Sequence, residues 1–128
     1  QAAGMSDAEA LAAVGAIRAT LGTATDVHLF SSTEGHYGAS AFDMFRTRGV
    51  TVHLDGDPLV AWAHFAAADV FVVGKSSFSR AAAWLNPRCV VHQGYGHPAP
   101  GWVHLESLVG LNRREGATPF AHCLGRLR

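Results

Sequence analysis

Residues 70–79, with the sequence VFVVGKSSFS, give the clearest indication of the fold. The run Val70–Val73 is continuous and apolar, which is typical of a strand buried on both faces of a parallel sheet. Gly74 turns the chain, and Ser77–Leu85 has the pattern of a helix that stops at Asn86-Pro87, because the residue before a proline disfavours helical geometry. This strand–turn–helix unit predicts an α/β protein.

Helical and strand patterns alternate on both sides of this unit. Three further short runs predict strands, at Asp26–Ser31, Val50–His53 and Cys89–His92. Helices are predicted after the capping box of Ser6 and Glu9, over residues 39–48, after Asp57-Pro58, and over residues 105–111. Such alternation implies parallel strands with right-handed crossovers. The predicted fold is a single Rossmann-like, doubly wound parallel sheet of about four strands, in the order 2-1-3-4, with helices on both faces.

The composition limits the classes of protein to which the chain can belong. Its 128 residues carry ten Lys or Arg and ten Asp or Glu, and this zero net charge excludes a general electrostatic binder of nucleic acid. No apolar run reaches the ~20 residues that span a bilayer, so a membrane-spanning chain is not expected. Cys89 and Cys123 indicate neither a disulfide framework nor a CxxC metal site. We expect one domain at residues 1–111 and a basic, weakly structured tail at residues 112–128.

The loop at residues 75–79 is the strongest candidate for a binding site. Ser76, Ser77 and Ser79 fall on the first turn of a helix, where unpaired backbone N–H groups and the positive end of the helix dipole are available. Such a place binds a phosphate or diphosphate, and Lys75 would add a positive charge. The alternative is that Ser76 caps the helix and the other serines are solvated.

Other polar residues are expected across a crevice from this loop, because the order 2-1-3-4 makes the loops after the first and third strands face each other. Ser31 and Glu34 lie in the first of these loops and are candidates for a ribose, sugar or diphosphate contact. Asp55 can accept hydrogen bonds from a base or ribose, whereas Asp57 also suits a helix cap. The eight histidines show no characteristic ligand spacing, so no metal site is predicted.

The serine block resembles that of a known family. Ser76–Ser79, followed by Ala82–Asn86, closely resembles the Ser-Ser-Phe-Ser block of alpha-1,2-fucosyltransferases. His64-Phe65 and Ala68–Val70 are similar to the same region of the wider superfamily, which includes the alpha-1,6 enzymes. The resemblance covers about residues 24–104.

This resemblance implies the C-terminal, donor-binding half of a GT-B glycosyltransferase. Such a half uses GDP-fucose or a similar nucleotide sugar, with no cofactor and no required metal. By analogy, Ser76, Ser77 and Ser79 would hold the diphosphate, and Asp55 or Asp57 would lie near the nucleoside.

Two features of that family are missing from the chain. The arginine motif, which resembles His-x-Arg-x-Gly-Asp, does not occur, and neither does the acceptor-binding half. We therefore expect a half that is inactive alone and needs its N-terminal half or other protein partners. The alternative hypothesis is a non-catalytic structural or accessory subunit of a larger assembly. A transferase would belong to the secretory pathway or Golgi, and a subunit to an organellar or other assembly.

Overall fold

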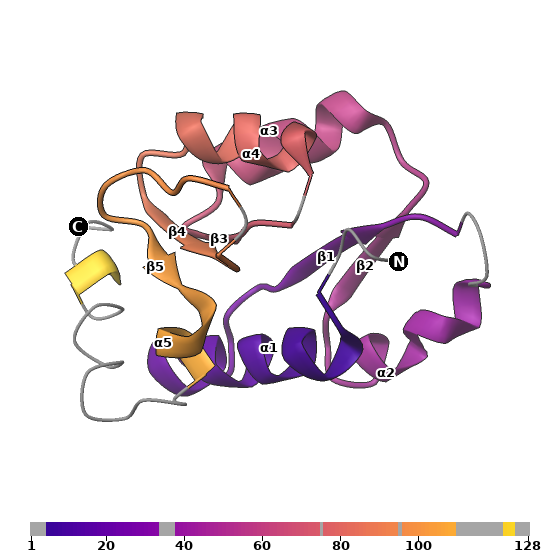
Figure 1. The fold of residues 1–128 in the computed structure, drawn as a ribbon. Coiled ribbons are helices and arrows are strands. Elements are labelled where there is room, and N and C mark those ends of the chain that lie inside the picture. Colours follow the sequence, from indigo (N-terminus) through magenta and orange to yellow (C-terminus); the bar gives the residue numbers. More distant parts are fainter. Residues whose placement is uncertain (1–4, 34–37, 75, 95, 110–121, 125–128) are drawn as a thin grey trace.

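The computed structural model describes residues 5–33, 38–74, 76–94, 96–109 and 122–124, in which helices and strands alternate (Figure 1). In chain order the elements are α1 (Asp7–Leu21), β1 (His28–Ser31), the 3₁₀ helix η1 (Ala39–Phe42), α2 (Asp43–Arg46), β2 (Thr51–Leu54), α3 (Pro58–Ala67), β3 (Val70–Val72), α4 (Ser77–Leu85), β4 (Cys89–His92), β5 (Val103–His104) and α5 (Leu105–Val109). Within these described ranges, none of the helices combines the length and the apolar character that crossing a membrane requires.

The strands form two small parallel sheets, so the prediction of a single four-stranded Rossmann-like sheet is wrong. β1 pairs with β2, in a register that runs from His28 opposite Thr51 to Ser31 opposite Leu54. The second sheet has the order β3-β4-β5. Two predicted neighbour pairs are therefore present, the first strand with the second and the third with the fourth. The order 2-1-3-4 fails because β1 and β3 belong to different sheets.

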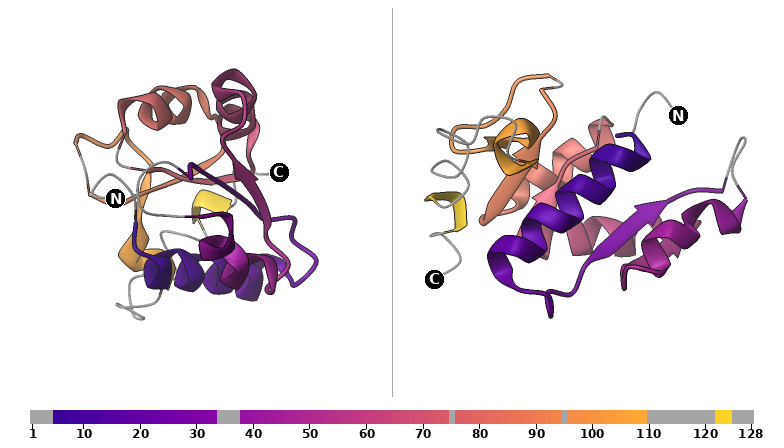
Figure 2. Two further views of the ribbon diagram at one scale, coloured as in Figure 1. Left: turned by 90° about the vertical axis from the view of Figure 1, so that its right-hand side faces the viewer. Right: turned by 90° about the horizontal axis from the view of Figure 1, so that it is seen from below.

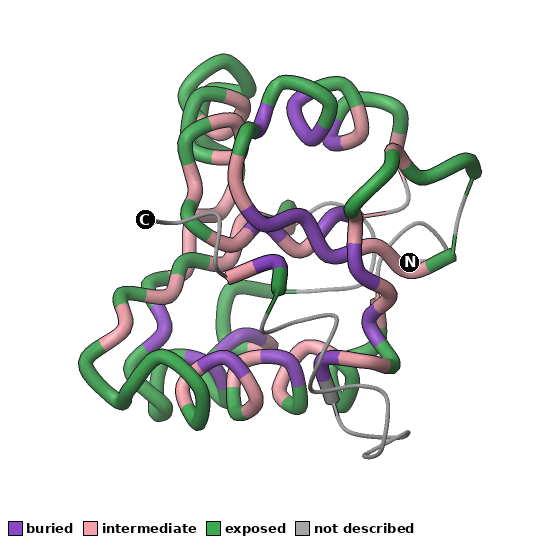
Figure 3. The backbone as a smooth tube through the Cα atoms, turned by 90° about the vertical axis from the view of Figure 1, so that its left-hand side faces the viewer, coloured by how far each residue is buried: buried purple, intermediate pink, exposed green. Residues whose placement is uncertain are grey.

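Helices cover the strands from two sides. α3 and α4 pack together on one side, and α1, α2 and α5 lie on the other (Figures 1 and 2). Buried residues lie between these layers (Figure 3). Among the described residues, three clusters form the core: one joins β1 and β2 to α1 and α2, a second joins β4 and β5 to α1 and α5, and a third joins β3 and β4 to α3 and α4.

Aromatic side chains of α3 join the two sheets. Phe65 of α3 meets Phe30 of β1 edge-on, with ring centroids 5.1 Å apart, and stacks on Phe71 of β3 at 4.7 Å. Aromatic pairs in these arrangements contribute about 0.5–1.5 kcal/mol beyond their buried area. The two sheets are thus held together by side-chain packing. In one continuous sheet, backbone hydrogen bonds would join the same strands. Alternating helices and strands predict parallel strands, but they do not determine which strands adjoin.

Most helix starts follow the predicted local signals. Ser6 and Glu9 form the capping box of α1, with the Glu9 N–H donating to the Ser6 hydroxyl oxygen at 3.1 Å and the Ser6 N–H donating to the Glu9 carboxylate at 2.9 Å. The helix predicted over residues 39–48 is instead a 3₁₀ turn followed by the single turn of α2. β5 is not predicted by the sequence, because a two-residue strand after a Gly- and Pro-rich loop has no distinctive pattern.

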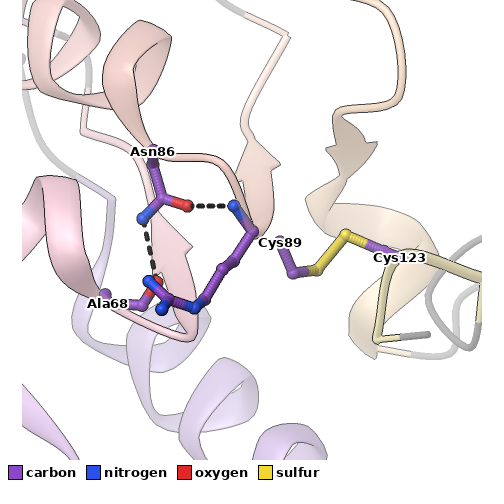
Figure 4. Close-up of a disulfide and its surroundings, with 5 residues drawn as sticks. Ala68, Asn86, Cys89 and Cys123 are labelled. Carbon is purple, nitrogen blue, oxygen red and sulfur yellow. Dashed lines mark hydrogen bonds between the residues drawn. A yellow bond between two sulfur atoms is a disulfide. The ribbon is translucent and has the colours of Figure 1, made fainter. Parts of the chain in front are cut away.

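Cys89 and Cys123 form a disulfide, which the sequence does not predict (Figure 4). They are 34 positions apart in the chain, their Cα atoms are 5.2 Å apart, and both side chains are buried. The bridge attaches residues 122–124 to the start of β4, and Cys123 packs in the core cluster that contains Ile17 and Leu108. The predicted boundary after residue 111 and most of the predicted tail lie outside the described residues.

Asn86 connects the ends of α3 and α4 close to this bridge (Figure 4). Its Nδ2 donates to the carbonyl oxygens of Phe65, at 2.8 Å, and Ala68, at 2.9 Å. Its Oδ1 accepts the Arg88 N–H at 2.8 Å. Asn86 is buried, so these bonds satisfy polar groups that water does not reach readily.

Candidate functional site

Alternation along β1 and β2 sorts their side chains onto two faces. Leu29 and Val52 pack into the core on the side of α1 and α2. Because successive strand residues point to opposite faces, His28, Phe30 and His53 lie on the other face, which α3 covers. The side chains on this face are therefore imidazoles and an aromatic ring, and two of them, Phe30 and His53, lie next to the last residues of their strands.

A pocket of about 410 Å³ lies at the carboxyl ends of β1 and β2, beside the start of α3. In open α/β sheets, ligands bind outside the carboxyl ends of the strands. Three of the predicted site residues, Ser31, Asp55 and Asp57, line this pocket together. Phe30 and His53 also line it, with ring planes 5° from parallel and centroids 4.3 Å apart.

Asp55 connects the end of β2 to the end of β1. The Thr33 hydroxyl donates to its Oδ2, and the Thr33 N–H donates to its Oδ1 at 3.0 Å. These bonds, with the hydroxyl contributing most, hold the pKa of Asp55 below its ordinary value, so the group is a carboxylate at neutral pH. Asp55 has a φ of 56°, a left-handed conformation in which Asp is found more often than most residues. The Ser32 side chain also hydrogen-bonds this carboxylate, so about one of its roughly four acceptor positions is left for a ligand.

Asp57 caps α3, as one of the two predictions for it proposes. Its Oδ1 accepts the Leu59 N–H at 2.8 Å, and Pro58 occupies the first turn. Asp57 and Ser31 are both exposed at the pocket. The pocket therefore presents two carboxylates and a hydroxyl beside an aromatic surface.

The described residues of the loop at 75–79, Ser76–Ser79 (the serine loop), do not line this pocket. The Ser76 hydroxyl oxygen accepts the Ser79 N–H at 3.2 Å, so Ser76 caps α4 as the alternative for this loop predicts. The Ser79 hydroxyl is buried and lies 3.2 Å from the Gly74 carbonyl oxygen and 3.1 Å from that of Ser76. Ser77 is exposed on the first turn of α4.

The crevice predicted between the first and third strands of one sheet is not formed, since β1 and β3 belong to different sheets. Ser31 accordingly lies in the same pocket as Asp55 and Asp57, and Ser76–Ser79 do not line that pocket. The remaining two predicted site residues, Lys75 and Glu34, lie outside the described residues.

Three histidines gather beside the pocket, on the same face of the first sheet. His28 Nδ1 lies 2.8 Å from His53 Nε2, and the Asp26 carboxylate lies 3.0 Å from His28 Nε2. The His64 ring of α3 is centred 5.7 Å from that of His28 and 5.8 Å from that of His53. Burial, and then the neighbouring His28 and His64, lower the pKa of His53. The cluster is not predicted from the sequence, although the spacing of His28 and Phe30 places both on one face of a strand.

Two further histidines, His92 and His104, lie at the carboxyl ends of β4 and β5. The rings of His92 and His104 are nearly perpendicular, with centroids 5.0 Å apart. The Nδ1 of each accepts a backbone N–H two residues further on, from Gly94 and Glu106, so the proton of each neutral ring is on Nε2. Burial, followed by the charges of His104 and Arg80, lowers the pKa of His92.

In the part of the chain that the structure describes, no group of three His, Cys, Asp or Glu is already arranged to hold a metal ion. Comparisons of the chain with protein-family models, with curated proteins and with solved structures found no match. The case for a function therefore depends on the pocket and on the side chains around it.

Proposed function

We propose that this chain binds a nucleotide sugar, such as GDP-fucose, as the donor-binding part of a fucosyltransferase-like protein, and that the pocket beside β1 and β2 takes the sugar or ribose. The observation that carries the proposal is the grouping of Ser31, Asp55 and Asp57 in that pocket. The resemblance of Ser76–Ser79 to the serine block of fucosyltransferases supports the choice of ligand class.

The chemistry of the pocket favours hydroxyl groups over phosphates. Sugar and ribose hydroxyls donate hydrogen bonds, and carboxylates such as Asp55 and Asp57 accept them strongly because the acceptor is charged. The same two charges repel a diphosphate, which therefore has to lie away from them. We assign the diphosphate to the first turn of α4, where Ser77 is exposed at the positive end of the helix dipole.

The proposed role is binding of the donor only. Transfer of the sugar also requires an acceptor hydroxyl held against the donor, and the proposal assigns none of the described residues to that task. We expect the acceptor to be provided by another domain or protein, as the resemblance implies.

The proposal is tested by the effect of GDP-fucose on the melting temperature. A ligand present at 100 times its Kd stabilises the folded state by about 2.7 kcal/mol, which is readily measured. Asp57→Asn removes a charge from the pocket and keeps the cap, because Asn caps helices as well as Asp does. Asp43→Asn is the control, since Asp43 pairs with Arg46 in α2 and does not line the pocket.

We expect GDP-fucose to raise the melting temperature of the wild-type chain and of Asp43→Asn, and to raise that of Asp57→Asn much less. The absence of a shift at millimolar GDP-fucose would contradict the proposal.

A second candidate function, that of an accessory subunit in a larger assembly, is favoured by exposed apolar side chains on α3 and α4. Leu59 is 76 % exposed, Trp84 58 % and Leu85 62 %. α3 has an apolar sequence, PLVAWAHFAA, yet each of its side chains stays at least partly exposed. Where exposed apolar side chains form a contiguous patch, they commonly mark protein contacts. Gentle extraction followed by size-exclusion chromatography tests this function: co-migration with larger partners supports it, and a monomer contradicts it.

A further inference from the structure

The histidine cluster on the face of the first sheet that α3 covers has the composition of a metal site. We propose that His28, His53 and His64 bind one divalent transition-metal ion of the zinc class, and that Asp26 orients His28 for this purpose. The inference is independent of the proposed function, because it concerns the imidazoles and requires no sugar or nucleotide.

Two of the three imidazoles already face each other through the nitrogens that would bind the ion. His28 Nδ1 and His53 Nε2 are 2.8 Å apart, a separation at which one of them must carry a proton. A metal ion replaces this proton. Zinc–nitrogen bonds of about 2.0–2.1 Å at a tetrahedral angle place two ligand nitrogens about 3.3 Å apart. The nitrogens therefore have to separate by about half an ångström. Since the ring centroids are 5.1 Å apart, the two nitrogens point at each other, and both rings also have to tilt toward a shared ion.

Asp26 supplies the outer contact that histidine ligands usually have. Its carboxylate lies 3.0 Å from His28 Nε2, so it accepts the proton on that nitrogen and leaves the lone pair on Nδ1 directed at His53. Such carboxylate–histidine pairs fix the tautomer of a ligand, raise its basicity and typically change metal affinity by 10–100-fold. Phe30 lies flat against the His53 ring and restricts its rotation.

His64 completes the set from α3. Its ring centroid is 5.7 Å from that of His28 and 5.8 Å from that of His53. Three imidazoles on one tetrahedral ion have centroids roughly 5 Å apart. The three nitrogens do not yet converge, in keeping with the absence of a ready-made group of three ligands among the described residues. His64 is exposed, so its side chain can rotate toward the pair without displacing core residues.

The ligand set decides the class of ion. Neutral imidazoles suit zinc, copper and nickel, whereas magnesium and calcium prefer oxygen ligands. Three protein ligands leave the fourth position of a tetrahedral ion open for water or another ligand. Because His53 also lines the pocket, the ion would lie at the edge of the pocket.

The experiment is a calorimetric titration of the full chain with Zn²⁺, together with absorption spectra of the Co²⁺-substituted protein, in which an intense visible band reports tetrahedral binding. His64→Asn and His53→Asn remove ligands, Asp26→Asn removes the orienting carboxylate, and His97→Asn removes an exposed imidazole outside the cluster. Each variant is compared with the wild type in its melting temperature without metal.

We expect one Zn²⁺ per chain, no binding of Mg²⁺, affinity at least about tenfold lower in His64→Asn and Asp26→Asn, and wild-type affinity in His97→Asn. If His53→Asn fails to fold, the exposed His64 decides the result. Absence of Zn²⁺ binding to the wild-type chain, or unchanged affinity in His64→Asn, would overturn the inference. Failure of the chain to bind GDP-fucose would leave it unaffected.

Discussion

Removal of the disulfide should lower the free energy of unfolding by a large fraction of its total. The bridge joins Cys89 to Cys123 across 34 positions. In the chain-entropy account, closing a loop of this length lowers the entropy of the unfolded chain by about 12–13 cal/mol/K, or about 4 kcal/mol at 25 °C. Since domains of this size are stable by about 5–15 kcal/mol, the loss is a quarter of the stability or more.

The assay is urea unfolding followed by tryptophan fluorescence, with and without a phosphine reductant. The matched control is the double variant Cys89→Ala with Cys123→Ala, in which the reductant should have no effect. We expect reduction of the wild-type chain, and the double substitution, each to cost about 4 kcal/mol. A loss below about 1 kcal/mol, or two thiols that react before any reductant is added, would refute the reasoning.

Three further predictions concern single side chains, each measured by urea unfolding. Asn86→Asp removes the donor to two carbonyl groups at the end of α3. Because each unsatisfied buried group costs about 1–3 kcal/mol, the free energy of unfolding should fall by at least that amount. A loss below about 1 kcal/mol would contradict this role of Asn86. Ser76→Ala should lower the free energy of unfolding by about 1 kcal/mol because it removes the cap of α4. Ser77→Ala, at an exposed neighbouring position, is the control and should change it by less than about 0.5 kcal/mol. Equal losses in the two variants would exclude the capping role of Ser76. The pKa of His92 is lowered in the folded protein, so the unfolded chain binds a proton at this residue more readily. His92 therefore does not reduce the free energy of unfolding above about pH 6.5, and it reduces it increasingly as the pH falls below that value. His92→Gln should therefore lose less stability than the wild type between about pH 7.5 and 5.5, and an identical loss would show that His92 does not contribute.

The parts of the fold that depend on a few neighbouring residues could be predicted from the sequence. The capping box of Ser6 and Glu9, the Asp57-Pro58 start of α3 and the strand Cys89–His92 are all present as predicted. Each of these features is determined within a window of about four residues, where hydrogen bonding and side-chain periodicity dominate.

The arrangement of the strands could not be predicted in the same way. Whether β1 lies beside β3 depends on how α3 packs, and the contact of Phe65 with Phe30 joins residues that are far apart in the chain. The pairing of Cys89 with Cys123 is a contact of the same long-range kind.

The candidate site was predicted in part for a related reason. Ser31, Asp55 and Asp57 follow two strands that are adjacent and parallel, so their proximity needs only the pairing of β1 with β2. The histidine cluster depends additionally on the register of that pair and on the position of α3 above it. Neither is visible in the spacing of histidines along the chain.

The central claim, that the pocket beside β1 and β2 binds the sugar or ribose of a nucleotide sugar, is tested most directly by a ¹H–¹⁵N NMR titration of the chain with GDP-fucose. The proposal predicts saturable shifts of the backbone amides of Ser31, Ser32 and Asp55, with the amide of Asp43 unchanged. Amides of the pocket that do not move at millimolar GDP-fucose, while the protein remains folded, would contradict it.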